Sequence, residues 1–468
     1  MLTIHTDAFD RDCERVSRRN FLSVGSLGFG ALSLSQLFAL KANAASGKPI
    51  VNDKAVVVLN LQGGATHIET FDPKMTAPAE YRAMFGEVKT NLPGVTFGSH
   101  FPGLAGLADK MAIVRSYRHG IGSHGTAAAH VISGGNPTKA MMGSVYARVA
   151  GMTHPETGIP LNSVITPGCI GDDYRKLGAQ IGRITSSGTL PKSYAPFDPS
   201  AGGEIVDNMK LKIAQGRLDD RKHLLNQLDD LKRRVDTSGS LESAASFQQQ
   251  AFDVIVGGVS DAFDWKLESP ETIARYDTSH IDIPKRLYKK KNKNLLRQSP
   301  VTLGKQMLMA RRLVEAGCGF VTVGSAGWDM HGNAFGIDDG MPILGTAVDK
   351  AASAFIEDLA ERGLTDKVLL VITGEFGRTP RINKKGGRDH WGNLCTLAFS
   401  GGGLPMGQVI GNSDSRASVP ASEPISSDNV YATIMHTLLD VAELRVQSNF
   451  PTDILKSVTE SQPIPQLG

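Results

Sequence analysis

Short runs of apolar residues, each closed by glycine or polar residues, recur along the chain. The first, AVVVLNLQGG at 55–64, has the form of a strand that is buried in a parallel sheet and leads into a loop. Later runs repeat this form. We therefore predict buried parallel strands at 55–64, 110–116, 318–325, 367–374 and 395–402.

Between these runs the apolar positions follow a helical period. Helices are predicted at 141–151, 301–317 and 341–363, and the last two end at Gly317 and Gly363, where glycine is the favoured C-terminal residue. Strands that alternate with helices predict an α/β domain with a parallel sheet. In such sheets the ligand site forms where loops leave the C-terminal ends of the strands, so the residues after each run are the first candidates for function.

The middle of the chain has a different pattern. A long charged helix is predicted at about 204–236, and a second helix follows through LESAASFQQQAFDVIVGG. We interpret about 200–298 as a helical insertion or lid on an α/β domain that spans 45–468. The basic run at 285–297 is either a solvated surface loop or a binding site for an anionic polymer.

The first 44 residues contain the parts of an export signal in their usual order. Arg18 and Arg19 precede the weakly apolar run SVGSLGFGALSLSQLFAL, and an A-x-A site ends at Ala44. This order predicts a twin-arginine signal peptide over 1–44, the twin-arginine export machinery as a partner and a periplasmic or cell-surface location. The alternative is an uncleaved membrane anchor. Once the signal is cleaved, we expect no stable membrane span.

Charge and cysteine content limit the possible partners and cross-links. The 50 basic and 47 acidic residues leave a formal charge of +3, so no chain-wide field favours nucleic acid as a partner. Cys13 lies in the predicted signal, and the other cysteines show no C-x-x-C spacing. We predict no disulfide framework and no zinc ribbon, with buried inert thiols at Cys318 and Cys395.

Polar residues follow the first and third predicted strands. His67, Glu69 and Asp72 lie within six residues on one loop, where they either converge on a cation or polar substrate or cap the next helix. After 318–325, alternate positions of an extended segment place three side chains on one side. These are Asp329, His331 and Asn333, which predict a metal or substrate role with Zn, Mn, Fe or Ca as the cation.

The strand at 367–374 leads into the segment that is densest in candidate residues. Glu375 and His390 are candidates to complete a ligand sphere, with Asp389 as a further candidate. Arg378 offers a planar fork that fits phosphate, sulfate or carboxylate. The alternative for Arg378 is an ion pair with Glu375 or Asp389 that holds the loop.

Four motifs carry a family resemblance. GGATHIETFDPK, WDMHGN, GEFGRTP and GRDHWGN, behind the export signal, resemble the bacterial exported family called domain of unknown function 1501, over essentially the whole mature chain. That family resembles a branch of the alkaline phosphatase and sulfatase superfamily. This wider resemblance implies a three-layer α/β/α sandwich with a mostly parallel sheet, and a site at the strand ends that holds one or two divalent metals.

The chain departs from the superfamily pattern at the positions that carry chemistry. The metal-binding Asp that ends the first strand is replaced by the neutral stretch Leu59-Asn60-Leu61-Gln62. The nucleophile position, ten residues before Gly134, holds His124 in place of a serine, threonine or cysteine. Where the superfamily has a later Asp-x-x-x-His, this chain has Asp329-x-x-x-Asn333, and where it has Asp-His, this chain has Glu375-Phe376. The final histidine of the pattern is matched by His390.

The stretch HGIGSHGTAAAHVISGG at 119–135 holds three histidines in different settings. His124, at a predicted helix start, is interpreted as a metal ligand, a general acid or base, a nucleophile or a positioning residue. His119 precedes the helix and is a further site candidate. His130 lies two turns into the helix and is predicted to pack against the sheet.

The leading hypothesis is an exported metal-dependent hydrolase of phosphate or sulfate esters that acts on an anionic ester or glycan. Few carboxylates are present, so one metal ion is easier to support than two. The expected ligands are Asp329, His331, Glu375 and His390, the expected catalytic residues are His124 and Arg378, and the additional candidates are His67, Asp72, Asn333, Asp389 and His119. The alternative is a non-catalytic binding or assembly protein on a degenerate phosphatase-like fold, which binds anionic glycans through the basic run.

Overall fold

The computed structural model describes residues 49–171, 173–174, 184–202, 259–289, 293–332, 335–447 and 450–468. The predicted export signal, most of the predicted insertion at 200–298 and the candidate residue Asn333 lie outside the described residues. No helix among the described residues is long and apolar enough to cross a membrane.

A seven-stranded sheet forms the centre of the described chain, in the order β11-β4-β10-β7-β1-β6-β5. Its strands are β1 (Ala55–Gln62), β4 (Met111–Val114), β5 (Asn162–Ile165), β6 (Phe320–Ala326), β7 (Val368–Gly374), β10 (Leu397–Gly401) and β11 (Gln408–Ile410). β1 pairs in parallel with β6 and β7, β5 pairs in parallel with β6, and β11 with β4. In the central register Val57 lies between Val321 and Leu370.

Strand β10 runs against its two neighbours. It pairs antiparallel with β4 and β7, so the parallel direction predicted for 395–402 is wrong, whereas the other four predicted runs form parallel strands. A parallel return needs a crossover connection, usually a helix, that carries the chain back along the sheet. Between β7 and β10 the chain forms only the hairpin of β8 (Gly377–Arg378) and β9 (His390–Trp391), and so it re-enters the sheet from the end at which it left.

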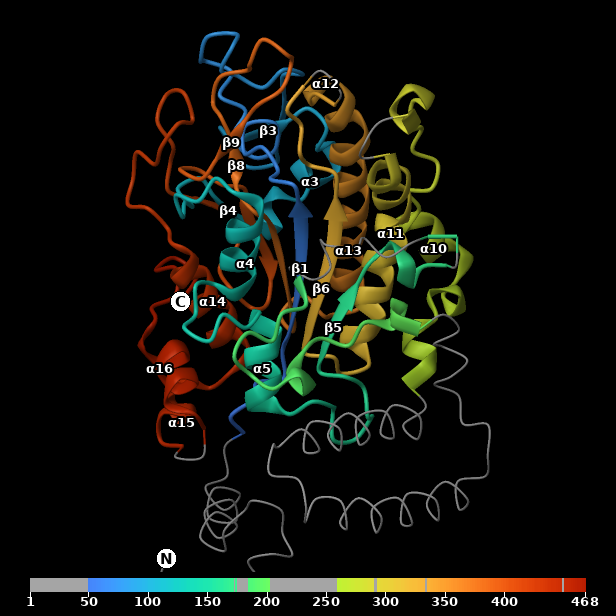
Figure 1. The fold of residues 1–468 in the computed structure, drawn as a ribbon, viewed down its shortest axis with the longest axis vertical. Coiled ribbons are helices and arrows are strands. Elements are labelled where there is room, and N and C mark those ends of the chain that lie inside the picture. Colours follow the sequence, from blue (N-terminus) through green and yellow to red (C-terminus); the bar gives the residue numbers. More distant parts are fainter. Residues whose placement is uncertain are drawn as a thin grey trace, which may run out of the picture.

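Helices cover both faces of the sheet, which gives three layers (Figure 1). One face packs against α11 (Lys293–Glu315) and α13 (Thr346–Glu361), and the other against α4 (His124–Ser133), α5 (Met142–Ala150) and α14 (Ser427–Leu438). The chain is therefore an α/β/α sandwich with a mostly parallel sheet, as predicted.

Short elements complete the described fold. The remaining strands are β2 (Glu87–Lys89) and β3 (Thr96–Gly98), and the remaining α-helices are α3 (Pro102–Ala105), α10 (Pro270–Tyr276), α12 (Ile337–Gly340), α15 (Val441–Arg445) and α16 (Thr452–Glu460). Single helical turns lie at Ala108–Lys110, Pro167–Cys169, Lys192–Tyr194, Pro199–Gly202, Val259–Phe263, Trp265–Leu267, Lys285–Lys289 and Met341–Gly345.

The predicted helix ends are confirmed more closely than the predicted starts. Gly317 and Gly363 follow α11 and α13 with φ of +102° and +68°, the left-handed region that glycine adopts without steric cost. Helix α11 begins earlier than the predicted residue 301 and contains Pro300, and α13 begins after the turn Met341–Gly345. The predicted start of α11 at 301 is too late because Pro300, which usually marks a helix boundary, lies inside the helix.

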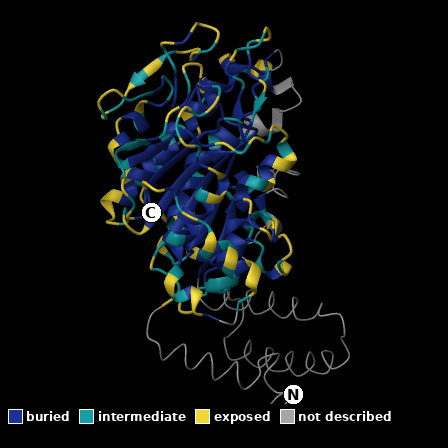
Figure 2. Cartoon of the chain, turned by 90° about the vertical axis from the view of Figure 1, so that its left-hand side faces the viewer, coloured by how far each residue is buried: buried dark blue, intermediate teal, exposed yellow. Residues whose placement is uncertain are grey.

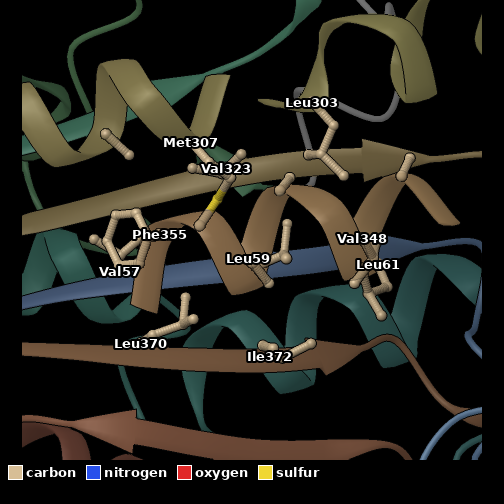
Figure 3. Packing of buried hydrophobic residues seen from close by; sticks show 14 of the residues in the cluster. Val57, Leu59, Leu61, Leu303, Met307, Val323, Val348, Phe355, Leu370 and Ile372 are labelled. Carbon is tan, nitrogen blue, oxygen red and sulfur yellow. The ribbon is translucent and has the colours of Figure 1, made fainter. Parts of the chain in front are cut away.

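The sheet interior is apolar on both faces, as expected for strands covered on two sides. Every residue of β1 is buried, and Figure 2 shows the strands inside a shell of exposed residues. Val57 and Leu59 point toward α11 and α13, where they meet Met307 and Phe355 (Figure 3). Full burial of each such aliphatic side chain contributes about 1.5–3 kcal/mol. The thiols of Cys318 and Cys395 are also buried and free, as predicted.

The fold brings the candidate residues to one end of the sheet. β1, β6 and β7 are parallel neighbours, so the loops that follow them leave side by side at their carboxyl ends. In Figure 1 the arrowheads of β1 and β6 point toward the end that carries β8, β9 and α12. The segments that begin at Gly63, Gly327 and Glu375 therefore meet in one region.

Candidate functional site

Asp329, three residues beyond β6, is the centre of a polar cluster. Its Oδ1 atom lies 3.0 Å from His331 Nε2, 3.3 Å from His390 Nε2 and 3.4 Å from His124 Nε2. The Nη2 atom of Arg378 donates to the same oxygen at 2.6 Å. One carboxylate oxygen thus collects three imidazoles and one guanidinium, and His124, Arg378 and His390 come from segments far from Asp329 in the sequence.

His124 is the first residue of α4, so its side chain projects from a helix start toward the cluster. The helix begins where a glycine-rich stretch gives way to three alanines, and it ends before Gly134, which has a left-handed φ of +63°. On its far side, His124 Nδ1 lies 2.7 Å from Glu375 Oε2. Glu375 is 2% exposed and its other oxygen accepts from Gly63 N at 2.8 Å, so both oxygens of Glu375 are engaged.

The other two imidazoles are held in the same manner. His331 Nδ1 lies 2.9 Å from Asp389 Oδ1, and His390 Nδ1 lies 2.9 Å from the carbonyl oxygen of Gly122. The β8 and β9 hairpin, in which Arg378 pairs with His390, sets the position of this second ring. Carbonyl and carboxylate oxygens only accept hydrogen bonds, so all three histidines donate from Nδ1 and direct Nε2 toward Asp329.

The convergence of these Nε2 atoms requires a positive charge or a shared proton. His331 Nε2 and His390 Nε2 lie only 2.9 Å apart, and both face the ionised carboxylate of Asp329. The hydrogen bonds of His124 with Asp329 and Glu375 raise the pKa of His124 to about 9, although burial opposes the shift. This set of atoms is therefore arranged to attract cations.

Asp329 stays ionised in this setting. Burial favours its neutral form, but hydrogen bonds from His124 and His390 and the charge of Arg378 hold the pKa of Asp329 well below its usual range. Burial likewise lowers the pKa of Arg378, while the charge of Asp329 opposes that shift. The two residues form a charged pair at the base of the cluster.

The donor atoms fit a metal ion. Among the described residues, His124, Asp329 and His390 offer ligand atoms that all lie within 4.8 Å of one another. In a tetrahedral site with bonds of about 2.0–2.1 Å, ligand atoms lie about 3.3–3.4 Å apart. The separations of Asp329 Oδ1 from His390 Nε2, 3.3 Å, and from His124 Nε2, 3.4 Å, agree with this spacing. His331 adjoins the group through Asp329 and His390.

The cluster is open on one side. The side chains of His124, Asp329, His331 and His390 are 28%, 31%, 39% and 26% exposed. Structural metal sites are closed by protein ligands, whereas catalytic sites keep a position for water or substrate. Half-buried ligands of this kind are compatible with a catalytic site.

The environment of Arg378 differs from the one expected. The side chain is 1% exposed, and its guanidinium donates to Asp329 and to the carbonyl oxygens of Gly63, Gly64, Trp328 and Arg388. Its ion-pair partner is Asp329, and neither Glu375 nor Asp389 fills that role. In this structure Arg378 presents no free fork for a substrate anion.

The loop after β1 contributes its backbone to the site but not its candidate side chains. His67 is buried, with Nε2 2.9 Å from the carbonyl oxygen of Ala417, and burial lowers its pKa to about 4. Asp72 instead pairs with Lys74 at 3.4 Å and with Arg115 at 3.6 Å. The structure therefore does not bring His67 or Asp72 into the cluster.

Glu69 and His119 also have partners of their own. Glu69 Oε1 accepts from Arg388 Nη2 at 3.0 Å and Glu69 Oε2 from Met84 N at 3.0 Å, so this carboxylate caps no helix. The ring of His119 packs 5.6 Å from that of His130, and burial lowers the pKa of His119 to about 4. His130 is only half-buried, in contact with His119.

The sequence analysis missed the loop that borders His331. Asn383 Nδ2 donates to the carbonyl oxygen of His331 at 3.1 Å, and Gly386 forms a β-bridge with Gly332. Between them, Lys384 and Lys385 are exposed. The signal was present as NKKGG between two candidate motifs, but only the fold shows that these lysines lie beside the cluster.

Comparisons with known proteins give a family and distant structural likenesses. The model of a family described as "Protein of unknown function (DUF1501)" matches residues 53–449. No curated protein matches the sequence.

Solved structures with a similar fold include three enzymes. The PsFucS1 sulfatase from Pseudoalteromonas sp. is 13% identical with a TM-score of 0.36, and the match covers 87% of this chain and 72% of that chain. The lipoteichoic acid synthase LtaP from Listeria monocytogenes is 10% identical with a TM-score of 0.30, covering 89% and 81%. The phosphonate monoester hydrolase SpPMH from Silicibacter pomeroyi is 12% identical with a TM-score of 0.28, covering 82% and 73%. At these values the function has to be argued from the chain's own residues.

Proposed function

Because this chain belongs to the DUF1501 family, whose description states no activity, we propose its function from the site: a metal-dependent hydrolase of phosphate or sulfate esters. The protein is exported by the twin-arginine machinery to the periplasm or cell surface, which follows from the signal sequence over 1–44. The substrate is an anionic ester, free or carried on a glycan.

The convergence of three Nε2 atoms on Asp329 Oδ1 is the observation that carries this proposal. His124, Asp329 and His390 hold the ion, and His331 adjoins it. Glu375 and Asp389 orient two of the imidazoles from behind, a role that differs from the ligand role expected of Glu375. A set rich in imidazole favours Zn or Fe over Ca, which prefers oxygen ligands.

The charge balance of the ligand set favours an anionic substrate. Among the described residues, Asp329 is the one carboxylate that faces the cluster centre, so a bound divalent ion would keep an excess of positive charge. Lys384 and Lys385 add exposed positive charge beside His331. When bound, a divalent ion would polarise the ester oxygen and lower the pKa of a water molecule.

The chain's own residues favour direct attack by water. Among the described residues, the side chains of the cluster hydrogen bond to imidazoles, carboxylates, a guanidinium and a backbone carbonyl oxygen, and to no serine, threonine or cysteine side chain. His331 is the most exposed imidazole at 39%, and its Nδ1 donates to Asp389. This arrangement fits His331 Nε2 to accept a proton from water and to return it to the leaving oxygen.

The test combines metal analysis with a substrate panel. Protein purified after export should contain a stoichiometric divalent metal and turn over aryl phosphates or aryl sulfates supplemented with Zn, Mn, Fe or Ca. His390→Ala should lose the metal and at least about 10²-fold in turnover. The matched control is His130→Gln, on the same helix as His124 but with His119 as its neighbour, which should keep both.

The outcome of the panel separates the two functional classes. Metal-free, folded protein, or His390→Ala with unchanged metal content, would contradict the metal centre. A loaded protein that hydrolyses no ester but binds an anionic glycan would instead indicate the non-catalytic binding or assembly protein.

A further inference from the structure

The guanidinium of Arg378 occupies a site built from three loops. Its Nε atom donates to Gly64 O at 2.9 Å, and Nη1 donates to Arg388 O at 3.1 Å. Nη2 faces Gly63 O, Trp328 O at 3.3 Å and Asp329 Oδ1 at 2.6 Å. These oxygens belong to the loops after β1, β6 and β7, so one buried cation joins all three.

The loops can approach this cation only because of their glycines. Gly63 has a φ of +110°, and a Cβ atom there would lie 2.7 Å from Asp329 N and 2.9 Å from Trp328 N. On the opposite side, a Cβ atom at Gly377 would lie 1.9 Å from Leu394 O. The backbone is thus shaped so that its carbonyl oxygens face inward, an arrangement that would be repulsive without a positive charge at the centre.

Asp329 links this cation to the imidazole cluster. The same oxygen that accepts from Arg378 at 2.6 Å lies 3.3 Å from His390 Nε2 and 3.4 Å from His124 Nε2. Rotation of the carboxylate away from the histidines would leave Arg378 buried without its counter-charge, which is costly. The guanidinium therefore fixes the direction in which Asp329 offers its oxygen.

Among the described residues, Asp329 is the one carboxylate that contacts the guanidinium of Arg378. The two oxygens of Glu375 are engaged by His124 and Gly63, and β1 ends in the neutral Gln62. A second divalent ion with Asp329 as its one carboxylate ligand would keep an excess positive charge in a buried setting. A single permanent positive charge suits this place, because its N–H groups face five oxygens, of which only Asp329 Oδ1 is charged, and His331 Nε2 at 3.4 Å.

From this geometry we infer that Arg378 is a built-in second cation. It positions Asp329 and the three strand-end loops for one exchangeable metal ion, and it contacts no substrate. The inference deepens the proposed function and rests on its metal centre.

Metal stoichiometry and affinity test this role without reference to turnover. Wild-type protein, titrated with Zn²⁺ in competition with a chelator, should bind one equivalent per chain. Arg378→Ala should weaken zinc binding about 10- to 100-fold, the range typical of residues that orient a ligand. Guanidinium ion at millimolar concentration should restore most of that affinity, whereas sodium at the same ionic strength should not.

Two further variants keep the test decisive. Arg115→Ala removes another arginine that donates to backbone carbonyls, those of Phe71 and Thr96, and pairs with a carboxylate outside the cluster. It should leave zinc affinity unchanged and unresponsive to guanidinium. If Arg378→Ala does not fold, Arg378→Lys retains the charge but not the fork, and it should bind one zinc ion with lower affinity than wild type.

The possible failures can be told apart. Wild-type protein that binds no metal contradicts the proposed function itself. Wild-type protein that binds two equivalents, or folded Arg378 variants that bind zinc as wild type does, overturns the inference alone. Recovery of Arg378→Ala by sodium as well as by guanidinium would likewise overturn it, because any salt would then replace the side chain.

Discussion

Two buried arginines, one in a helical layer and one at the strand ends, are neutralised in contrasting ways. Between α10, α11 and α13, Arg311 is 1% exposed and lies 2.8 Å from Glu268, 2.5 Å from Glu315 and 3.0 Å from Asp358. Tyr276 donates to Asp358 as well, at 2.9 Å. Among the described residues, three carboxylates thus surround this arginine, and the pair with Asp358 links α11 to α13.

The strand-end cluster has the reverse composition. Arg378 is equally buried, but Asp329 is its one carboxylate partner among the described residues, and its other partners are backbone carbonyls and His331 Nε2. The same Asp329 is shared with three imidazoles whose Nε2 atoms face it. The helical network pairs its arginine with carboxylates of the protein, whereas the cluster at the strand ends would be completed by the proposed metal ion. That difference separates a structural ion network from a candidate metal centre.

Removal of Asp358 should have the largest effect on stability. Asp358→Ala leaves Arg311 with less counter-charge and Tyr276 without its acceptor, so the free energy of unfolding should fall by about 3–5 kcal/mol. Equilibrium urea denaturation measures the loss, and zinc content should not change. The control Glu357→Ala alters an exposed neighbour on α13 and should have little effect. A loss of bound zinc in folded Asp358→Ala would contradict the separation of the two regions.

A smaller and more specific effect is expected behind His124. Glu375→Gln weakens the acceptor for His124 Nδ1 in a buried position, and zinc affinity should fall about 10- to 100-fold. Asp389→Asn makes the equivalent change behind His331, but Asp389 is 59% exposed, so water can replace the lost charge and the effect should stay below about threefold. Competition titration with a chelator measures both. Equal losses in the two variants would show that burial does not decide the strength of these contacts.

The sequence predicted the architecture well because buried parallel strands and capped helices leave local signals. It could not predict the direction of β10, since an apolar run reads the same in either direction and only the connection decides. It also missed β5 and β11, which are short and carry little apolar pattern.

The candidate site was predictable in part. Residue type and position after the strands identified Asp329, His331 and His390, and the family resemblance identified His124; the structure brings all four together. The sequence could not show that Glu375 faces Nδ1 of His124 and not the centre, because spacing along the chain carries no information on side-chain direction. It also could not predict the environment of Arg378, which depends on carbonyl oxygens of three separate loops and not on side-chain types.

The last predicted effect concerns the exposed charge at the edge of the cluster. Replacing Lys384 and Lys385 by alanine removes two positive charges beside His331 without touching Arg378 or the imidazoles. For an anionic ester at low ionic strength, kcat/KM should fall about 3- to 10-fold, and the difference should vanish in high salt because exposed charges are screened. The matched control replaces Lys192 and Lys456, which are exposed on other elements, and it should leave kcat/KM unchanged. Zinc affinity should be the same in all these proteins. If the Lys384 and Lys385 variant lost zinc, the loop would belong to the metal centre itself; if its kcat/KM were unchanged at low salt, substrate recruitment would rest on the cluster alone.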